Sequence, residues 1–460
     1  MKFDKSFHGT LRLNPVNPRY FTDDSGKAVY LTGSHTWTVM QDVWLPSKPP
    51  KQMDYAGFLQ MMEDNGHNFL RFWQHLQLSG GERASQAEYD PLPYNRSGQG
   101  KAADGLPKLD LSDWNEAYFA RLRQRVQQAG EKGIYVSIMF FEGCAIKLSL
   151  PEAPSWPYHP FNPANNVNGI TDDPMVADTG KALDLFSLNC PQFLHWQKQF
   201  VMKVVDAVND LDNVLFEISN EVPNRKEAFA WLDHMCAFVK QYESGKPKQH
   251  PVGITAEGGD QDNALLFATC ADWISPGNGK VFEYRYNPPA ADGRKVILND
   301  TDHLWGHGGD SMWVWKSFTR GMNVLFMDPW EPHIGNFDFW RIDENVTYNQ
   351  RYFHAWDPLR RSLGYTRYFA QRMNLNACEP RNDLCTSSYC LADVGNTYLC
   401  YLPAGGDEGL DLWNVEGVFA LEWFNPATGL TTKGKDLKGN WRYVLSQPFS
   451  GPGVAFIYKK

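Results

Sequence analysis

Two short apolar runs of this sequence end in acidic residues. Residues 214–221, VLFEISNE, begin as a buried β-strand would and end with Glu221, two residues before a helix-breaking proline. Residues 295–303, KVILNDTDH, carry Asp300 and Asp302 near their end. Two carboxylates that face each other across a cleft suit the cleavage of a glycosidic bond, because one can protonate the leaving oxygen while the other attacks the anomeric carbon.

This chemistry needs two carboxyl groups with different pKa values. The acid must keep its proton near neutral pH and the nucleophile must be ionised, and partial burial beside a like charge can produce that difference. Alternation along a strand would place Asp300 and Asp302 on the same side. We therefore predict Glu221, Asp300 and Asp302 as the catalytic residues.

Most of the other apolar runs end in polar or aromatic residues. The chain contains 17 Trp, and flat rings can pack against the apolar faces of a ligand. Glu217 lies deeper in its run, so we predict a structural carboxylate paired with an Arg or a Tyr. We predict that a carbohydrate ligand is contacted by His35, Trp37, Arg71, Trp73, Asn220, Glu257, His303, Trp305, Asp328 and Trp330.

The elements that must position these residues alternate in a regular way. Apolar runs separated by helix-length segments are typical of βα units and a parallel sheet, and continuous rather than alternating runs indicate strands covered on both faces. The eight runs span residues 28–37, 68–75, 134–143, 214–221, 251–258, 272–278, 295–303 and 323–330. The pattern predicts a (β/α)8 TIM barrel, whose active site lies at the C-terminal ends of its strands. An open doubly wound sheet is the alternative, but no GxGxxG turn follows the first run.

Helices are expected between the runs, and two longer stretches are expected to build the cleft. The predicted helices span residues 54–65, 113–130, 191–209, 225–243, 261–271, 309–320 and 357–375. Stretches 79–112 and 143–190 are too long for simple connections, and long loops at the strand ends usually carry binding residues. Before the barrel, the segment RYFTDDSGKAVYLTG predicts a hairpin that closes the bottom of the barrel.

The periodicity of apolar residues changes near residue 379. Short alternating strands and turns replace the helical period, as in SYCLADVGNTYLCYLP and GVAFIYKK. The sequence therefore predicts two domains: a barrel with its N-terminal hairpin at residues 1–378, and a small antiparallel β-sandwich at residues 379–460.

Charge and composition exclude several classes of partner. The formal net charge is −9, with no basic run, which argues against nucleic acid as a partner. No segment reaches the apolar length of a membrane span, and the N-terminus has no apolar core of a secretory signal. We expect no cofactor and no membrane partner, with a cytoplasmic location, or a periplasmic or secreted one if a leader has been removed.

Eight cysteines occur, and none forms a CxxC pair, so a structural zinc site is not expected. Four of them lie between Cys378 and Cys400. One disulfide there is an open alternative, but the pattern favours unpaired, partly buried thiols.

The order of these residues along the barrel resembles a known clan. An Asn-Glu pair ends the fourth strand, Arg71 the second and Trp330 the eighth, and a carboxylate ends the seventh. This arrangement resembles the clan A retaining glycoside hydrolases. The segment RYFTDDSGKAVYLTGSHTW and the small C-terminal β domain look like the apiosidase-like and cellulase-like bacterial proteins of that clan.

The resemblance implies roles for individual residues. Glu221, which follows Asn220, would be the acid/base, and the carboxylate of the seventh strand would be the nucleophile. This sequence has Asp300 and Asp302 where the clan usually has Glu. The alignment of VILND favours Asp300, with Asp302 and Glu257 as alternatives.

Two other functions remain alternatives. The barrel could bind carbohydrate without catalysis, with its carboxylates only accepting hydrogen bonds from hydroxyl groups. It could also be a metal-dependent hydrolase that uses ligands among Asp300, Asp302, His303, His35 and His307. The amidohydrolase type of metal site needs a His-x-His pair at the first strand, and GSHTW supplies only one His. We therefore predict no metal.

Overall fold

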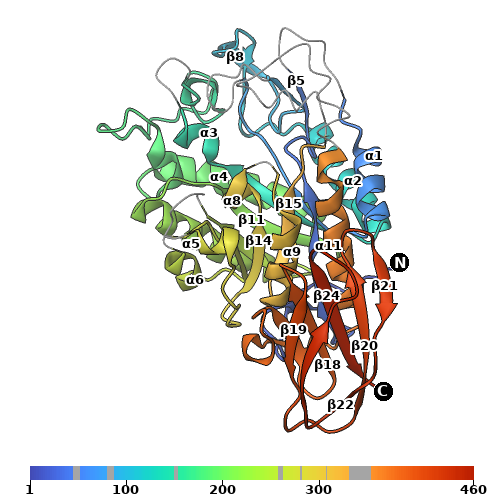
Figure 1. The fold of residues 1–460 in the computed structure, drawn as a ribbon. Helices are drawn as coiled ribbons and strands as arrows, with labels where there is room; N and C mark the ends of the chain where they lie inside the picture. Colours follow the sequence, from blue (N-terminus) through green and yellow to red (C-terminus); the bar gives the residue numbers. More distant parts are fainter. Residues whose placement is uncertain are drawn as a thin grey trace.

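The computed structural model shows an α/β barrel with an antiparallel domain at its lower end, and the loop elements α3, β5 and β8 at its upper end (Figure 1). The structure describes residues 1–44, 52–79, 88–149, 154–256, 263–279, 282–306, 308–330 and 354–460.

Eight parallel strands form the barrel, and each lies in one of the eight predicted runs. They are β4 (Thr32–His35), β6 (Phe69–Phe72), β10 (Tyr135–Glu142), β11 (Val214–Asn220), β12 (Val252–Thr255), β13 (Trp273–Ser275), β14 (Val296–Asp300) and β15 (Asn323–Met327). Their spatial order is β4-β15-β14-β13-β12-β11-β10-β6. The terminal strands of this order, β4 and β6, lie in contact, so the sheet is nearly closed. The predicted TIM barrel is confirmed.

A glycine allows this close approach between the first and last strands of the order. A Cβ on Gly33 of β4 would lie 2.0 Å from the carbonyl oxygen of Phe69 in β6. Thr32 N also donates to Asn68 Oδ1 at 2.9 Å, which joins the two strand starts.

Helices surround the strands and overlap all seven predicted segments. They are α1 (Tyr55–Asp64), α2 (Glu116–Glu131), α3 (Cys144–Lys147), α4 (Pro191–Val208), α5 (Lys226–Glu243), α6 (Ala264–Ala268), α7 (Glu283–Tyr286), α8 (Asp302–Trp305), α9 (Ser311–Thr319) and α11 (Asp357–Ala370). Short 3-10 turns are η2 (Trp156–Tyr158), η3 (Leu183–Phe186), η5 (His354–Trp356) and η6 (Asn382–Leu384). No helix among the described residues is long and apolar enough to cross a membrane.

Short antiparallel pairs lie outside the barrel. Strands β1 (Arg12–Leu13), β2 (Phe21–Thr22) and β3 (Ala28–Val29) form a three-stranded sheet in which β2 and β3 make the expected hairpin. Phe21 packs with Phe69, Tyr135 and Trp273 at the starts of barrel strands, so the sheet covers the bottom of the barrel. In the upper loops, β5 (Asp42–Trp44) pairs with β7 (Glu88–Asp90), and β8 (Gly98–Lys101) with β9 (Pro107–Lys108).

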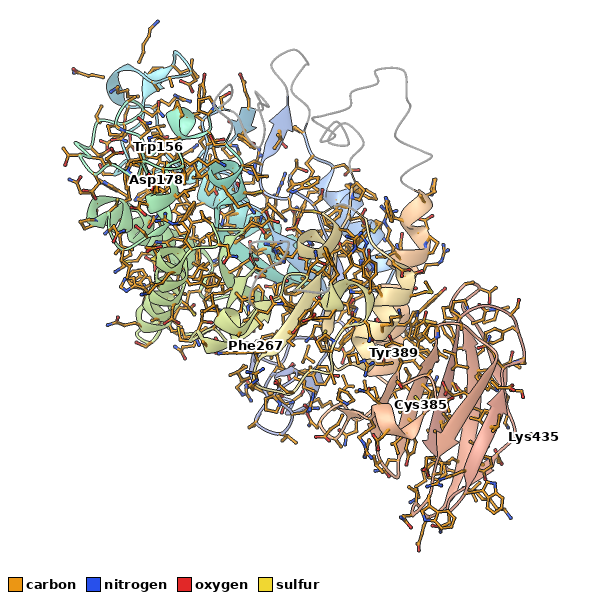
Figure 2. The ribbon with its side chains drawn as sticks, turned by 60° about the vertical axis from the view of Figure 1, so that its left-hand side comes forward. Trp156, Asp178, Phe267, Cys385, Tyr389 and Lys435 are labelled. Atoms are coloured by element: carbon orange, nitrogen blue, oxygen red, sulfur yellow. The ribbon has the colours of Figure 1, made fainter. Side chains whose placement is uncertain are left out.

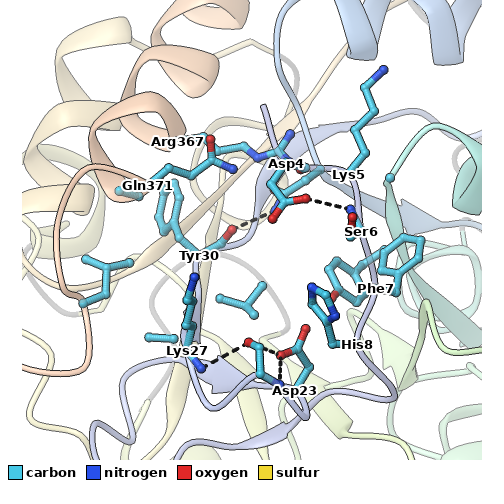
Figure 3. A pocket seen from close by; sticks show the side chains of 18 of the residues that line it. Asp4, Lys5, Ser6, Phe7, His8, Asp23, Lys27, Tyr30, Arg367 and Gln371 are labelled. Carbon is cyan, nitrogen blue, oxygen red and sulfur yellow. Dashed lines mark hydrogen bonds between the residues drawn. The ribbon is translucent and has the colours of Figure 1, made fainter. Parts of the chain in front are cut away.

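A cavity of about 560 Å³ lies at this bottom end (Figure 3). It is lined by the N-terminal segment around Phe7, by the hairpin at Asp23 and Lys27, and by Arg367 of α11. Because active sites of TIM barrels lie at the opposite end, this cavity is not the candidate active site.

The C-terminal domain contains two antiparallel sheets. The larger has β16 (Glu379–Pro380), β17 (Cys390–Asp393), β18 (Thr397–Leu402), β24 (Gly453–Lys459), β20 (Val418–Asn425) and β21 (Leu430–Lys433) in this order, with β22 (Leu437–Lys438) paired to β20. The smaller has β19 (Asp407–Asp411) and β23 (Arg442–Ser446). An apolar core between them includes Leu410, Trp423 and Ile457. The predicted antiparallel domain is therefore present, and the boundary between residues 378 and 379 stays a prediction.

The larger sheet also packs against the barrel helices. Trp315 of α9 and Phe369 of α11 form one buried cluster with Tyr401, Phe424 and Phe456. Trp315 stacks on Tyr401 with ring centroids 5.9 Å apart. Burial of several aromatic side chains indicates a firm attachment between the barrel and this domain.

Candidate active site

Polar side chains from β4, β6, β11, β14 and α8 converge at the C-terminal ends of the barrel strands. Arg71 lies at their centre and is 1% exposed. Its Nε and Nη2 donate to the two carboxylate oxygens of Glu217, at 2.7 and 2.6 Å. Its Nη1 donates to Asp302 at 2.8 Å and lies 3.4 Å from Asp300. One buried guanidinium therefore contacts three carboxylates, and the predicted pairing of Glu217 with an Arg is confirmed, while its structural role stays a prediction.

Asp300 is fully buried, and its oxygens are occupied by the protein. His35 Nε2 lies 2.9 Å from Asp300 Oδ1, and the backbone N of Asp302 donates to the same oxygen at 3.0 Å. His35 Nδ1 accepts from Trp73 Nε1 at 2.9 Å, so the imidazole proton is on Nε2 and points to Asp300. Although burial opposes ionisation, His35 and Arg71 lower the pKa of Asp300. Asp300 is therefore a buried anion that positions its neighbours.

Asp302 differs from Asp300 because it reaches the surface of the site. Its side chain is 9% exposed, whereas that of Asp300 is 0% exposed. Burial raises the pKa of Asp302 well above its ordinary value, and the neighbouring Glu221 and Asp300 raise it further against the opposing effect of Arg71. The expectation that both aspartates share one face of a strand is wrong, because β14 ends at Asp300 and Asp302 begins α8.

Glu221 follows β11 in a strained conformation. Its φ of 42° lies in the left-handed region, which costs a non-glycine residue about 1 kcal/mol or more and often marks a functional position. Gly143 lies against this backbone, because a Cβ there would be 2.9 Å from Glu221 O and 2.8 Å from Val222 Cα. Lys147 Nζ of α3 donates to Glu221 Oε2 at 2.9 Å.

The carboxylates of Glu221 and Asp302 face each other. One oxygen of each, together with a ring nitrogen of His303, lies in a group whose atoms are all within 4.8 Å of one another. The same three groups could hold a metal ion. However, Lys147 and Arg71 already donate to the two carboxylates, and their positive charge disfavours a divalent cation at this place.

Asn220 is fixed beside this pair. Its Oδ1 accepts from Arg71 Nη2 at 2.6 Å and from His303 Nε2 at 3.1 Å. His303 Nδ1 lies 2.9 Å from Ser275 Oγ, which therefore donates to it. Burial and the charge of Arg71 lower the pKa of His303 well below its ordinary value, so this ring is neutral. The Nδ2 of Asn220 has no acceptor among the described residues and is available to donate to a ligand.

The four predicted tryptophans have different environments. Trp73 is 3% exposed and packs edge-to-face with Trp37, while the Arg71 guanidinium lies 5.0 Å from its ring centroid. Trp305 and Trp330, like Trp37, are only partly buried. These three rings could still offer a face to a ligand, whereas Trp73 supports His35 from within the core.

Asp328 is fully buried, and its carboxylate is held by a partner outside this cluster. Arg360 of α11 donates to it through Nε, at 2.8 Å, and through Nη2. This bidentate ion pair joins the end of β15 to α11, and we assign it a structural role. The predicted contact of Asp328 with a substrate has no support in this geometry.

Two residues considered from the sequence, Glu257 and His307, lie outside the described residues. Conversely, Lys147 was not predicted. It lies in the long stretch after the third strand, whose length indicates a binding loop without indicating which of its residues enters the site.

Comparisons with known proteins agree with the fold. A family model described as a domain of unknown function, DUF6298, matches residues 79–291. The curated proteins contain no match. A solved structure named "Glycoside hydrolase" is 11% identical over 98% of this chain and 97% of its own, with a TM-score of 0.62. A glycoside hydrolase family 5 structure from Bacteroides vulgatus ATCC 8482 is 11% identical over 98% of this chain and 94% of its own, with a TM-score of 0.63.

A putative glycoside hydrolase from the same organism is 12% identical over 100% of this chain and 84% of its own, with a TM-score of 0.60. These values confirm that the chain shares the barrel fold of a family 5 glycoside hydrolase. At such low identity, the comparison shows the fold alone.

Proposed function

We propose that this protein is a glycoside hydrolase that cleaves a glycosidic bond of an oligo- or polysaccharide with net retention. The observation that carries the proposal is the pair Glu221 and Asp302, with one oxygen of each within 4.8 Å of the other. Nearest oxygens this close favour the separation of about 5–5.5 Å between the carboxyl groups of retaining enzymes over the separation of about 6.5–9.5 Å that admits a water molecule in inverting enzymes.

In this proposal Glu221 is the acid/base and Asp302 the nucleophile. Asp302 replaces Asp300, the first choice from the sequence, because Asp300 is fully buried and its oxygens already accept from His35, Asp302 N and Arg71. Asp302 would attack the anomeric carbon while Glu221 protonates the departing oxygen. Glu221 would then deprotonate a water molecule that cleaves the glycosyl-enzyme.

Arg71 and Lys147 have opposite effects on which carboxyl group, that of Glu221 or that of Asp302, carries a proton. The raised pKa of Asp302 favours the protonated form of this carboxyl group. The reaction requires that proton on Glu221. The hydrogen bond from Arg71 to Asp302 favours that distribution, whereas the ion pair between Lys147 and Glu221 opposes it.

Asn220 would contribute to substrate binding. Its oxygen is held by Arg71 and His303, which leaves the amide nitrogen as a donor for a ligand. A donor beside the anomeric carbon can bind the 2-hydroxyl group of the sugar, an interaction that strengthens in the transition state.

Hydrolysis of a panel of aryl glycosides, followed by proton NMR of the first-formed anomer, tests the proposal. Net retention is expected, with no loss of rate after treatment with a chelator. An inverted product would refute the retaining mechanism. Loss of activity with the chelator, regained on adding a divalent cation, would support a metal-dependent hydrolase. Saturable binding of oligosaccharides without turnover would support a binding barrel.

A further inference from the structure

Three cysteines from different segments meet inside the C-terminal domain. Cys390 and Cys400 are direct partners on the adjacent strands β17 and β18. Cys385 follows η6 and forms a bridge with Leu410 of β19. The three side chains therefore come together where the larger sheet meets the smaller one, in the part of the domain marked by Cys385 in Figure 2.

The thiols of these residues are close and shielded from solvent. All three sulfur atoms lie within 4.8 Å of one another. Cys385 is 7% exposed, and Cys390 and Cys400 are 0% exposed. In a tetrahedral zinc site with Zn–S bonds of about 2.3 Å, the sulfur atoms are about 3.8 Å apart. Small movements of the side chains would therefore bring the three thiols to the spacing of zinc ligands.

A buried carboxylate on the same core face is a second indication of a ligand. Glu408 is 1% exposed, and it shares the inward face of β19 with Leu410, the bridge partner of Cys385. Its Oε1 accepts from Thr386 Oγ1 at 2.6 Å and from Ser387 N at 2.9 Å. Its Oε2 has no partner among the described residues. An unpartnered carboxylate oxygen inside a core is costly unless something binds it.

We propose that Cys385, Cys390 and Cys400 bind one zinc ion, and that the fourth position is taken by a water molecule or by Glu408, whose oxygens lie outside the 4.8 Å group and would move toward the ion. Thiolates select a soft or borderline cation over Mg²⁺ or Ca²⁺. Binding replaces the three thiol protons, which leave to solvent, with three Zn–S bonds, and no oxidation occurs. Because two ligands lie on β17 and β18 and the third, Cys385, lies in the segment before β17 that bridges to β19, the ion would link the two sheets of the domain.

Metal content and thiol protection of the full chain test this proposal. The reduced protein is incubated with zinc and freed of excess ion, and its bound zinc is measured by mass spectrometry. One zinc per chain is expected. Alkylation during brief unfolding, with peptide mapping, should show these three thiols protected by zinc and Cys378 unprotected. Replacing zinc with cobalt(II) should produce a thiolate-to-metal charge-transfer band.

Two variants locate the ion. The double variant Cys390→Ser/Cys400→Ser should retain less than about a tenth of the zinc, whereas Cys270→Ser, which changes an exposed thiol, should retain all of it. If the double variant does not fold, thiol protection in the unmodified chain decides. Substoichiometric zinc, equal protection of Cys378, or a disulfide between Cys390 and Cys400 that resists mild reductant would overturn the proposal.

Discussion

The proposed role of Glu221 as general acid is tested most directly by Glu221→Gln. The glutamine keeps the shape of the side chain, and its carbonyl oxygen can still accept from Lys147 Nζ, which lies 2.9 Å from Glu221 Oε2. The side chain of Glu221 is 15% exposed, so the new amide group can be hydrated and the fold should persist. The variant therefore removes the transferable proton with little other change.

The size of the effect follows from the leaving group. Proton transfer by a positioned side chain contributes about 10²- to 10⁴-fold to the rate, and a factor of ten corresponds to about 1.36 kcal/mol. Glu221→Gln should therefore raise the barrier for a sugar leaving group by about 2.7–5.4 kcal/mol. A nitrophenolate leaves without protonation, so kcat/KM for a nitrophenyl glycoside should fall by less than about tenfold.

The assay compares kcat/KM for the two leaving groups in the wild type, Glu221→Gln and a control. Glu227→Gln is a suitable control, because Glu227 is an acid of the adjacent helix α5 with a side chain 43% exposed. Azide should accelerate turnover of the nitrophenyl substrate by Glu221→Ala, because it attacks the glycosyl-enzyme without a general base. Equal losses for both leaving groups, with circular dichroism unchanged, would show that Glu221 is not the acid.

Four further results are expected. Asp302→Asn should abolish turnover yet maintain or raise stability to urea at pH 7, because the raised folded pKa of Asp302 means that its ionised form destabilises the fold above the unfolded pKa. Asp300→Asn should lower the free energy of unfolding by about 3–5 kcal/mol. Since the folded pKa of Asp300 is lowered, this difference should be present above the unfolded pKa and disappear as the pH falls toward the folded value. Lys147→Met should move the alkaline limb of kcat/KM to higher pH, and Lys147→Arg should restore it, because loss of a cation favours the protonated carboxyl pair. Asp328→Asn should also cost about 3–5 kcal/mol in urea unfolding, with KM unchanged if its role is structural.

The barrel could be predicted because its strands are short apolar runs. Every residue of β11 and β14 is buried, so both faces of each strand must be apolar or carry satisfied polar groups. A strand of this kind is therefore recognisable in the sequence as a continuous apolar run. The polar residues within or at the ends of the strands, including Arg71 and Glu217, could be found for the same reason, because they interrupt or end an apolar run.

The local ends of elements could not be predicted as well. The alternation of a β-strand predicts that the seventh strand continues through Asp302. In the structure, the backbone N of Asp302 donates to Asp300 Oδ1, and this Asx turn ends the strand. Similarly, Asp113 was expected to begin a helix, whereas Asn115 caps α2 and accepts from Ala117 N. Asp and Asn side chains compete for the same backbone amides, so neighbouring candidates cannot be ranked from their sequence alone.

Charge balance connects the candidate site to the proposed chemistry. Four carboxylates, of Glu217, Asp300, Asp302 and Glu221, meet two cationic side chains, Arg71 and Lys147. Glu217 takes two of the Arg71 donors and Asp300 is buried with His35, so Asp302 and Glu221 are the carboxyl groups left for the proposed reaction. The surplus of negative charge thus falls on the pair that the proposed mechanism uses as acid and nucleophile. Replacing Glu217 or Asp300 with a neutral residue would reduce this surplus of negative charge. The two side chains would therefore influence the reaction without touching the substrate.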